Sequence, residues 1–209
     1  MEHDKNGSGS LMHVNPLLDR KLLEDTLVIA LDRVMPQAGN IEYRLLGTGA
    51  ALLHGVELPA GDIDILAKDR KAVDAFNDAL ACFKCLYPPS FLEHSRQYYV
   101  EFEINGVCVG ISTVEIETDL DWVETYGPGP WVHYVLLPCG SYMVPTVKLE
   151  LRLITELHRN RQERYNPLIE YMKTRRYDIA LLNRGMNGLK KDVREEVLGR
   201  LSDQSRSFG

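Results

Sequence analysis

The chain has 209 residues, 44% of them hydrophobic and 26% charged, which suits one globular domain or a domain with a helical extension. It has no apolar run near the roughly 20 residues of a membrane helix and no secretory signal pattern, so we expect a cytoplasmic protein with no membrane association. The net charge of −6 disfavours a general nucleic-acid binder.

The charge is unevenly distributed along the chain. Residues 1–147 hold 10 Lys and Arg against 21 Asp and Glu, a balance of −11, whereas residues 148–209 hold 14 against 9, a balance of +5. An acidic part facing a basic part is what a site for a metal and a polyphosphate requires. Two solvated faces of opposite sign would explain the same pattern.

The first half of the chain predicts a helix followed by alternating short strands and helices. Residues 1–13 are expected to form a disordered arm or a tag, and Asn15-Pro16 then predicts a helix start. We expect this helix to end near Met35-Pro36. The later predicted elements are an apolar run at 43–46, a short helix at 50–55, a strand at 61–67 and a helix at 70–86.

The second half predicts a hairpin, an irregular segment and then helices. Asn105-Gly106 joins two alternating runs, at 98–104 and 107–113, and this dipeptide is the strongest short hairpin signal. Residues 125–140 are rich in Gly and Pro and predict loop and short strand. From Val147 we expect a long helix to about Tyr165, another from Asn166-Pro167, and a last one at 190–201.

Four cysteines, Cys82, Cys85, Cys108 and Cys139, lack the second pair that a zinc site needs. We expect buried thiols in a reducing setting, with metal binding or redox chemistry of the Cys82–Cys85 pair as the alternatives. The predicted fold class is α+β. It comprises a small mixed β-sheet flanked by helices over residues 14–140 and a helical C-terminal part, residues 141–206, packed on it.

The candidate site centres on Asp62 and Asp64 in the predicted strand 61–67. Residues two apart on a strand point to the same face, so these two carboxylates project together while Ile63 and Ile65 face the core. Two carboxylates on one face repel each other unless a cation lies between them, and Mg²⁺ accepts such oxygen ligands beside substrate phosphates. A solvent-exposed edge strand is the alternative.

Gly47-Thr48-Gly49 precedes this strand and predicts a phosphate-binding turn. Glycine lets the backbone approach a phosphate closely, and the following helix directs free N–H groups towards it. Thr48 would add a hydroxyl donor. The turn lacks the Gly-Lys-Ser/Thr of a P-loop and the third glycine of a dinucleotide-binding fingerprint.

Gly47-Thr48-Gly49 followed by Asp62-Ile63-Asp64 resembles the nucleotidyltransferase superfamily, which includes antibiotic adenylyltransferases and minimal nucleotidyltransferases. The likeness covers about residues 40–115. It implies an enzyme that transfers a nucleoside monophosphate from a Mg²⁺- or Mn²⁺-bound NTP to a hydroxyl with release of pyrophosphate. Asp62 and Asp64 would then be metal ligands, and Gly47, Thr48 and Gly49 would bind phosphate.

The chain departs from this family at the third carboxylate, whose position is occupied by Gly110. With a two-residue Asn105-Gly106 turn, Glu101 pairs with Gly110 and shares its face. Our hypothesis is that Glu101 supplies the missing carboxylate, with Glu103 as the second choice. A polar outer face of the sheet is the alternative.

Lys148 is the candidate cation for the triphosphate, because related enzymes use Lys or Arg from a helix in this region. It lies on one predicted helical stripe with Arg152 and Arg159, although ion pairs on a solvated helix explain the same residues.

The expected function is nucleotidyl transfer to an unknown small-molecule or protein acceptor. The alternative is a catalytically inactive nucleotidyltransferase-like module that binds nucleotide or a partner protein, including one half of a toxin–antitoxin pair. Oligomeric state and the choice of NTP do not follow from the sequence.

Overall fold

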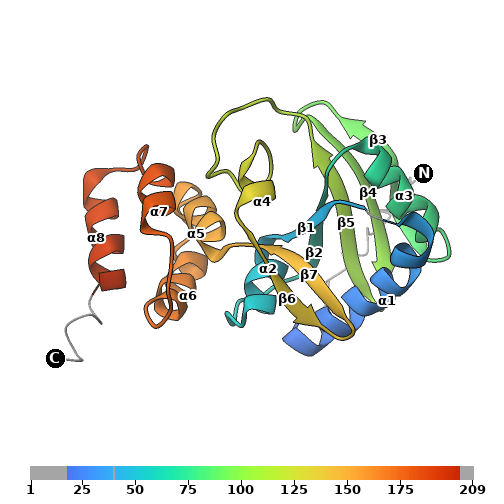
Figure 1. The fold of residues 1–209 in the computed structure, drawn as a ribbon, viewed down its shortest axis with the longest axis horizontal. Helices are drawn as coiled ribbons and strands as arrows, with labels where there is room; N and C mark the ends of the chain where they lie inside the picture. Colours follow the sequence, from blue (N-terminus) through green and yellow to red (C-terminus); the bar gives the residue numbers. More distant parts are fainter. Residues whose placement is uncertain (1–17, 40, 203–209) are drawn as a thin grey trace, which may run out of the picture.

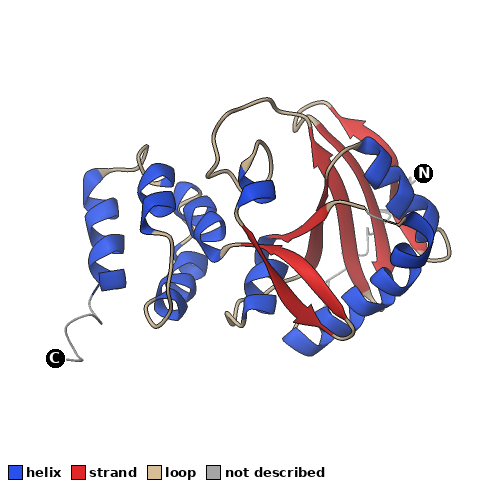
Figure 2. Cartoon of the chain, in the orientation of Figure 1, coloured by secondary structure: helices blue, strands red, loops and turns tan. Residues whose placement is uncertain are grey.

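The computed structural model describes residues 18–39 and 41–202, and one mixed seven-stranded sheet organises them (Figures 1 and 2). The strands lie in the order β3-β4-β5-β2-β1-β7-β6. Their bounds are β1 (Tyr43–Leu46), β2 (Asp62–Ala67), β3 (Lys84–Leu92), β4 (Gln97–Ile104), β5 (Val107–Val114), β6 (Tyr134–Cys139) and β7 (Tyr142–Val147). β2 runs parallel to β5 and β1 parallel to β7, whereas the other neighbours are antiparallel. The predicted α+β class with a mixed sheet is confirmed.

Eight helices accompany the sheet in the described residues: α1 (Arg20–Ala38), α2 (Gly47–His54), α3 (Arg70–Ala79), α4 (Gly129–Val132), α5 (Leu149–His158), α6 (Gln162–Met172), α7 (Ile179–Gly185) and α8 (Lys191–Ser202). α1 and α3 pack on each other and on β4, so they cover one face of the sheet. α5 to α8 form a group of helices at the other end of the molecule (Figure 1). None of the helices in residues 18–39 and 41–202 is long and apolar enough to cross a bilayer.

One part of the hydrophobic core lies between the sheet and the layer of α1 and α3. Ile63 and Ile65 of β2 are fully buried there, as the alternation of this strand predicts, whereas Asp62 and Asp64 are exposed on the opposite face. α3 buries Phe76 on the same side, where its ring meets the Tyr43 ring edge-on at a centroid distance of 5.8 Å. The carboxylates are therefore held by a strand whose other face is anchored in the core.

The hairpin prediction is confirmed residue by residue. Asn105 and Gly106 both have positive φ, at 54° and 75°, as a type I′ turn requires. The register of β4 and β5 pairs Ile104 with Val107 and Glu101 with Gly110. The turn chemistry thus sets which β4 residues face the site.

The predicted helix 70–86 is wrong beyond Ala79, where α3 ends, because β3 begins at Lys84. Pro88 and Pro89 lie in β3, and the pairing with β4 is irregular on both sides of Tyr87. Proline is tolerated in an edge strand, where its missing N–H faces solvent, and β3 is an edge of this sheet. The amphipathic pattern of α3 had continued by chance into the following turn.

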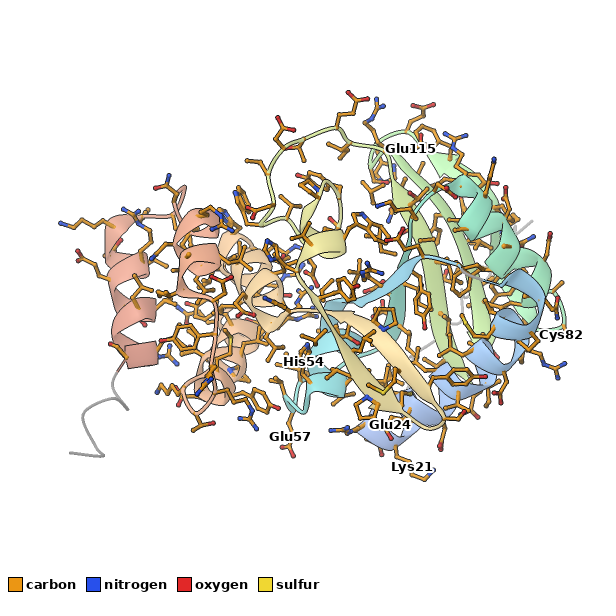
Figure 3. The ribbon with its side chains drawn as sticks, in the orientation of Figure 1. Lys21, Glu24, His54, Glu57, Cys82 and Glu115 are labelled. Atoms are coloured by element: carbon orange, nitrogen blue, oxygen red, sulfur yellow. The ribbon has the colours of Figure 1, made fainter. Side chains whose placement is uncertain are left out.

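Cys82 and Cys85 are exposed, so the expectation that these two thiols are buried is wrong. Cys82 lies in the turn after α3 at the periphery of the molecule (Figure 3). Cys139 is buried, as expected, and none of the four cysteines forms a disulfide. No group of three metal-ligating side chains that could hold a metal ion forms within the described residues.

The C-terminal helices differ from the predicted ones at their boundaries. The single helix expected from Val147 to Tyr165 is interrupted after His158, where Asn160 adopts a φ of 52°, and α6 begins at Gln162. Pro167 lies inside α6 and does not begin a helix. α4 and α7 were not predicted, whereas α8 lies close to the expected range.

The beginning of the chain and the end of the sheet also differ from expectation. The expected arm at 1–13 and helix start at Asn15-Pro16 lie outside the described residues. α1 begins at Arg20, where the Asp19 carboxylate accepts a hydrogen bond from the N–H of Leu22 at 2.7 Å, and it continues through Pro36. β7 pairs with β1, so the sheet continues past residue 140.

Alanine substitutions at a turn glycine and at a helix glycine should change the free energy of unfolding in opposite directions. Gly106→Ala places a Cβ at a φ of 75° and should lower the free energy of unfolding by about 1 kcal/mol. Gly199→Ala, inside α8 where a Cβ meets nothing within 4 Å, should raise it by up to about 1 kcal/mol. Chemical denaturation of both variants measures the two signs, and a destabilised Gly199→Ala would contradict this account of α8.

Candidate active site

Asp62 and Asp64 stand on the open face of β2, in the middle of the sheet. In the register of the strands, Asp64 lies between Leu46 of β1 and Gly110 of β5, and Asp62 lies beside Cys108. The two carboxylates thus share one face, as the sequence predicts. Because Gly110 also pairs with Glu101 of β4, Asp64, Gly110 and Glu101 form one row across three strands.

Gly47 joins β1 to α2 directly beside Asp64. Its φ is 68°, and a Cβ at this position would overlap the carboxylate oxygen Oδ2 of Asp64. Glycine is therefore required both for the backbone conformation and for the close approach. α2 begins at Gly47 itself, so Gly47, Thr48 and Gly49 form the first turn of the helix and are buried. The sequence had placed the start of this helix at Ala50.

Glu124, which the sequence reasoning missed, connects this turn to the C-terminal helices. Its carboxylate is buried and accepts a hydrogen bond from the Gly47 N–H at 3.0 Å. The other carboxylate oxygen accepts from the Arg152 guanidinium of α5 at 2.7 Å. Glu124 lies in the irregular segment before α4, where no periodicity or local motif marks a functional carboxylate.

Arg152 and Arg159 bring positive charge to the same place. Arg152 is buried, and its guanidinium also forms an ion pair with Glu156 of α5. Its Nε atom is buried and has no hydrogen-bond partner among the described residues. Burial first, and then the neighbouring arginines, lower the pKa of Arg159 from its ordinary value. Both arginines line the same cavity as Asp64, which Lys148 does not.

The acidic and basic groups line one cavity of about 200 Å³. Its lining residues are Leu46, Gly47, Asp64, Gln97, Ser112, Val114, Glu124, Thr125, Arg152 and Arg159. The cavity thus joins the helix start, one of the two aspartates and two arginines, which is the residue set needed for a metal-bound polyphosphate.

The electrostatics of the cavity act mainly on Asp64. Desolvation in the cavity, followed by the negative charges of Asp62 and Glu124, raises the pKa of Asp64 to about 6, although Arg152 and Arg159 act in the opposite direction. The residue keeps contact with solvent, since it is exposed on the face of the sheet. A nearby cation would therefore stabilise the charged form of the Asp64 carboxylate.

Tyr99 occupies the space that Gly110 leaves free. A Cβ at position 110 would lie 2.9 Å from the Tyr99 hydroxyl oxygen, so a side chain there would require the Tyr99 ring to move. Burial first, and then the charges of Glu101, Asp64 and Asp62, raise the pKa of Tyr99, and its hydroxyl is hydrogen-bonded to the Glu101 side chain. The phenol therefore lies in the row that connects Glu101 to Asp64.

The other predicted residues lie further from the cavity. Glu103 forms an ion pair with Lys84 at 2.9 Å. Lys148, at the N-cap of α5, does not line the cavity with Asp64 but a separate one on another side of the helix. Their predicted roles, and that of Glu101, stay predictions.

The residues present suit a magnesium ion with a bound nucleotide. Asp62 and Asp64 provide two carboxylates on one face, and Mg²⁺ in nucleotide enzymes is commonly held by one or two carboxylates, with phosphate oxygens and waters completing its shell. Desolvation, and then repulsion from Asp62 and Glu124, raise the pKa of Asp64. A divalent ion bound there would favour its charged form.

This fold is similar to that of nucleotidyltransferase-like proteins. A candidate nucleotidyltransferase from Thermotoga maritima is similar, with a TM-score of 0.53 and 19% identity over 76% of this chain and 98% of that one. An antigenic nucleotidyltransferase-like protein from Paracoccidioides brasiliensis has a TM-score of 0.50 and 17% identity, over 90% and 91% of the two chains. No family model and no curated protein sequence matches the chain. At these identities the likeness establishes the nucleotidyltransferase-like fold.

The raised pKa of Asp64 predicts a pH-dependent gain in stability for Asp64→Asn. The folded-state value of about 6 exceeds the ordinary 3.8, so Asp64 adds stability that is complete below pH 3.8 and is lost as the pH rises through about 6. Asparagine stays neutral. Without Mg²⁺, wild type and variant should have similar stability near pH 4, and the variant should be more stable above pH 7, by about 1 kcal/mol after allowance for solvent screening.

Thermal unfolding between about pH 4 and pH 8 measures this difference. Glu57→Gln serves as a control because Glu57 is an exposed loop residue outside the cavity. A variant that is equally destabilised at every pH would contradict the electrostatic account of Asp64.

Proposed function

We propose that this protein is a nucleotidyltransferase that transfers a nucleoside monophosphate from Mg-NTP to an acceptor hydroxyl and releases pyrophosphate. The observation that carries the proposal is the contact of Asp64 with Gly47 at the start of α2, in a cavity that also contains Arg152 and Arg159. Carboxylates for a metal, helix N–H groups and arginines for phosphates meet there.

Each group has a role that follows from its position. Asp62 and Asp64 hold Mg²⁺, which supplies charge neutralisation of the triphosphate. Arg152 and Arg159 contact phosphate oxygens and stabilise the charge that develops on the departing pyrophosphate. Mn²⁺ offers the same coordination chemistry.

The transfer itself is an in-line displacement at the α-phosphorus. The acceptor oxygen forms a bond to this phosphorus while the bond to the oxygen bridging the α- and β-phosphates breaks, and pyrophosphate leaves with that electron pair. The hydroxyl proton passes to a carboxylate. Glu101 takes this role in our proposal, since it lies in the same row as Asp64 and next to the glycine at the usual third position. Glu103 is the second choice.

A second function is favoured by the same glycine. Gly110 leaves only two carboxylates on β2 and none on β5 within this face, so a module that binds nucleotide without transferring it also fits. Such a module would act through a partner protein, as in a toxin–antitoxin pair. The acceptor of an active enzyme is a small molecule or a protein side chain in this proposal, since the chain is acidic as a whole.

Nucleotide titration tests the donor site directly. ATP, GTP, CTP and UTP are titrated calorimetrically with and without Mg²⁺ on the wild type and on the Asp62→Asn/Asp64→Asn double variant. We expect at least one NTP to bind in a Mg²⁺-dependent manner and the double variant to lose this binding, because both metal-holding carboxylates are gone. NTP binding that is the same with and without Mg²⁺, and the same in the wild type and the double variant, would contradict the proposed site.

A second prediction separates the enzyme from the binding module. Glu101→Gln should lower the rate of Mg²⁺-dependent pyrophosphate release about 100-fold or more, with nucleotide affinity kept, because a general base is lost and no metal ligand is removed. The rate is measured with each bound NTP and a panel of hydroxylated small molecules and proteins.

Glu115→Gln, a carboxylate paired with Arg70 away from the cavity, is the matched control. A loss confined to Glu103→Gln would assign the base to Glu103. Full activity of both variants would refute the carboxylate repair of Gly110, and nucleotide binding without pyrophosphate release in the wild type would favour the binding module.

A further inference from the structure

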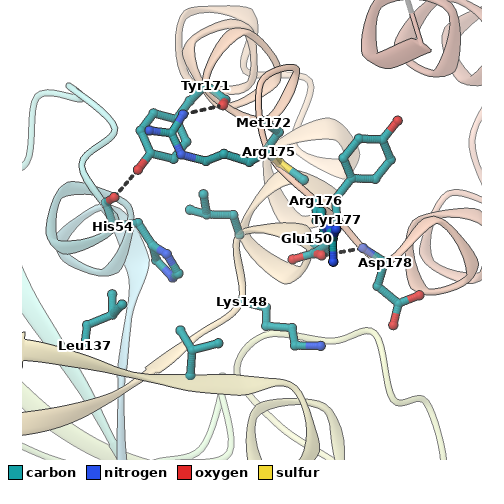
Figure 4. A pocket seen from close by; sticks show the side chains of 12 residues that line it. His54, Leu137, Lys148, Glu150, Tyr171, Met172, Arg175, Arg176, Tyr177 and Asp178 are labelled. Atoms are coloured by element: carbon teal, nitrogen blue, oxygen red, sulfur yellow. Dashed lines mark hydrogen bonds between the residues drawn. The ribbon is translucent and has the colours of Figure 1, made fainter. Parts of the chain in front are cut away.

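A second cavity, of about 420 Å³, lies between β6, α2, α5 and α6 (Figure 4). Glu150 of α5 lines this cavity, whereas Arg152 of the same helix lines the cavity with Asp64. Residues two apart on a helix point in nearly opposite directions. The two cavities are thus on different sides of α5, and they share no lining residue.

Part of the lining of this second cavity is apolar. Val135 and Leu137 come from β6, Leu149 from α5 and Met172 from α6. Figure 4 shows Leu137 on the same side as His54, with Met172 across the cavity. This apolar lining would bind an uncharged, apolar body of a ligand, since contact with it removes apolar surface from water.

The elements that surround this cavity are held in place by hydrogen bonds between segments that are distant in sequence. The His54 ring, whose pKa burial lowers, donates from Nε2 to the carbonyl of Val147 at 2.9 Å. The Tyr171 hydroxyl of α6 donates to the carbonyl of His54. The Arg175 guanidinium stacks on the Tyr171 ring at 3.4 Å from its centroid. The cavity is therefore preformed.

Lys148 provides an available positive charge. Its side chain is half-buried and extends along the cavity (Figure 4), and its ammonium makes no hydrogen bond or ion pair with the described residues. The backbone hydrogen bond from Leu181 first, and then the charge of Lys148, lower the pKa of Asp178. Both nearby acids accept hydrogen bonds from backbone groups. Glu150 accepts from the Asp178 N–H at 2.7 Å, and Asp178 accepts from the Leu181 N–H at 2.9 Å as the cap of α7.

We propose that this cavity binds a small organic anion, whose carboxylate, sulfonate or phosphate group pairs with Lys148 and whose apolar body contacts the apolar lining of Val135, Leu137, Leu149 and Met172. The volume lies within the range of small-molecule sites. The geometry assigns Lys148 to this ligand and not to the triphosphate. The site needs neither Mg²⁺ nor the aspartates of β2.

Ligand-observed NMR on the full chain tests the proposal with probes matched in shape and differing in charge. Indole-3-acetate, naphthalene-1-sulfonate and phenyl phosphate present three anionic groups on an aromatic body. Tryptamine has the indole body with a cation, and acetate has the anion without the body. We expect saturable binding of at least one aromatic anion at or below about 1 mM, and neither tryptamine nor acetate should reach it. No saturable binding of any aromatic anion, or equal binding of tryptamine, would overturn the proposal.

Two variants then locate the bound anion. Lys148→Gln should weaken binding of the anion about tenfold through loss of the charged hydrogen bond, and Leu137→Trp should abolish binding by filling the cavity. Lys71→Gln, an exposed lysine on α3, should leave it unchanged. Because Lys148→Gln removes only a half-buried charge, it remains informative if the larger Leu137→Trp side chain prevents folding. Unchanged affinity in Lys148→Gln would overturn the assignment of this residue.

Competition distinguishes this site from the proposed nucleotide site. The anion should bind equally well to the Asp62→Asn/Asp64→Asn variant, and saturating Mg-ATP should not displace it. These results hold whether or not the protein transfers nucleotides. Displacement by Mg-ATP would place Lys148 and this cavity in the donor site and would overturn the proposal of a separate one.

Discussion

The buried carboxylate of Glu124 holds together the three parts of the chain that form the candidate active site. One oxygen accepts from the Gly47 N–H at the start of α2, and the other accepts from Arg152 of α5. The loop before α4, the first helix after β1 and the C-terminal helices therefore meet at one residue. A buried carboxylate is costly unless it is paired and hydrogen-bonded, so this position of α5 relative to the sheet is the one in which Glu124 is satisfied. Loss of either partner would leave an uncompensated charge in the interior.

The middle of the sheet and the aspartates were predictable because local rules decide them. Strict alternation in β2 places Ile63 in the core and Asp64 outside it, and the Asn105-Gly106 turn sets the register of β4 and β5. The pairing of Glu101 with Gly110 follows from that turn alone. Glu124 was not predictable, because its partners are 77 and 28 residues away in the sequence and no local pattern signals them.

The residue at which α5 begins explains why Lys148 does not line the cavity with Asp64. A stripe of Lys148, Arg152 and Arg159 supposes that all three residues are helical, whereas Lys148 has extended backbone at a ψ of 148° and is the N-cap of α5. Its side chain therefore leaves the stripe and lines the second cavity. Arg159 lies at the other end, as the C-cap with helical dihedrals, and stays near Arg152. A helix start two residues later than expected thus places Lys148 away from the cavity that contains Asp64.

Gly110 has a structural consequence as well as a chemical one. An aspartate at this position would bring a third carboxylate next to Asp64, whose pKa is already raised by burial and then by the charges of Asp62 and Glu124. In this chain the Tyr99 phenol occupies the space beside Gly110. The candidate third carboxylate is on Glu101, one strand further from Asp64. Adjacent strands are separated by about 4.8 Å, so Glu101 lies roughly 10 Å from Asp64 along the row, measured between backbones. The side chains of Asp64 and Glu101 can contact the same cation and its nucleotide across such a distance only if both extend towards Gly110. Tyr99, hydrogen-bonded to Glu101, is the group that would have to permit this movement.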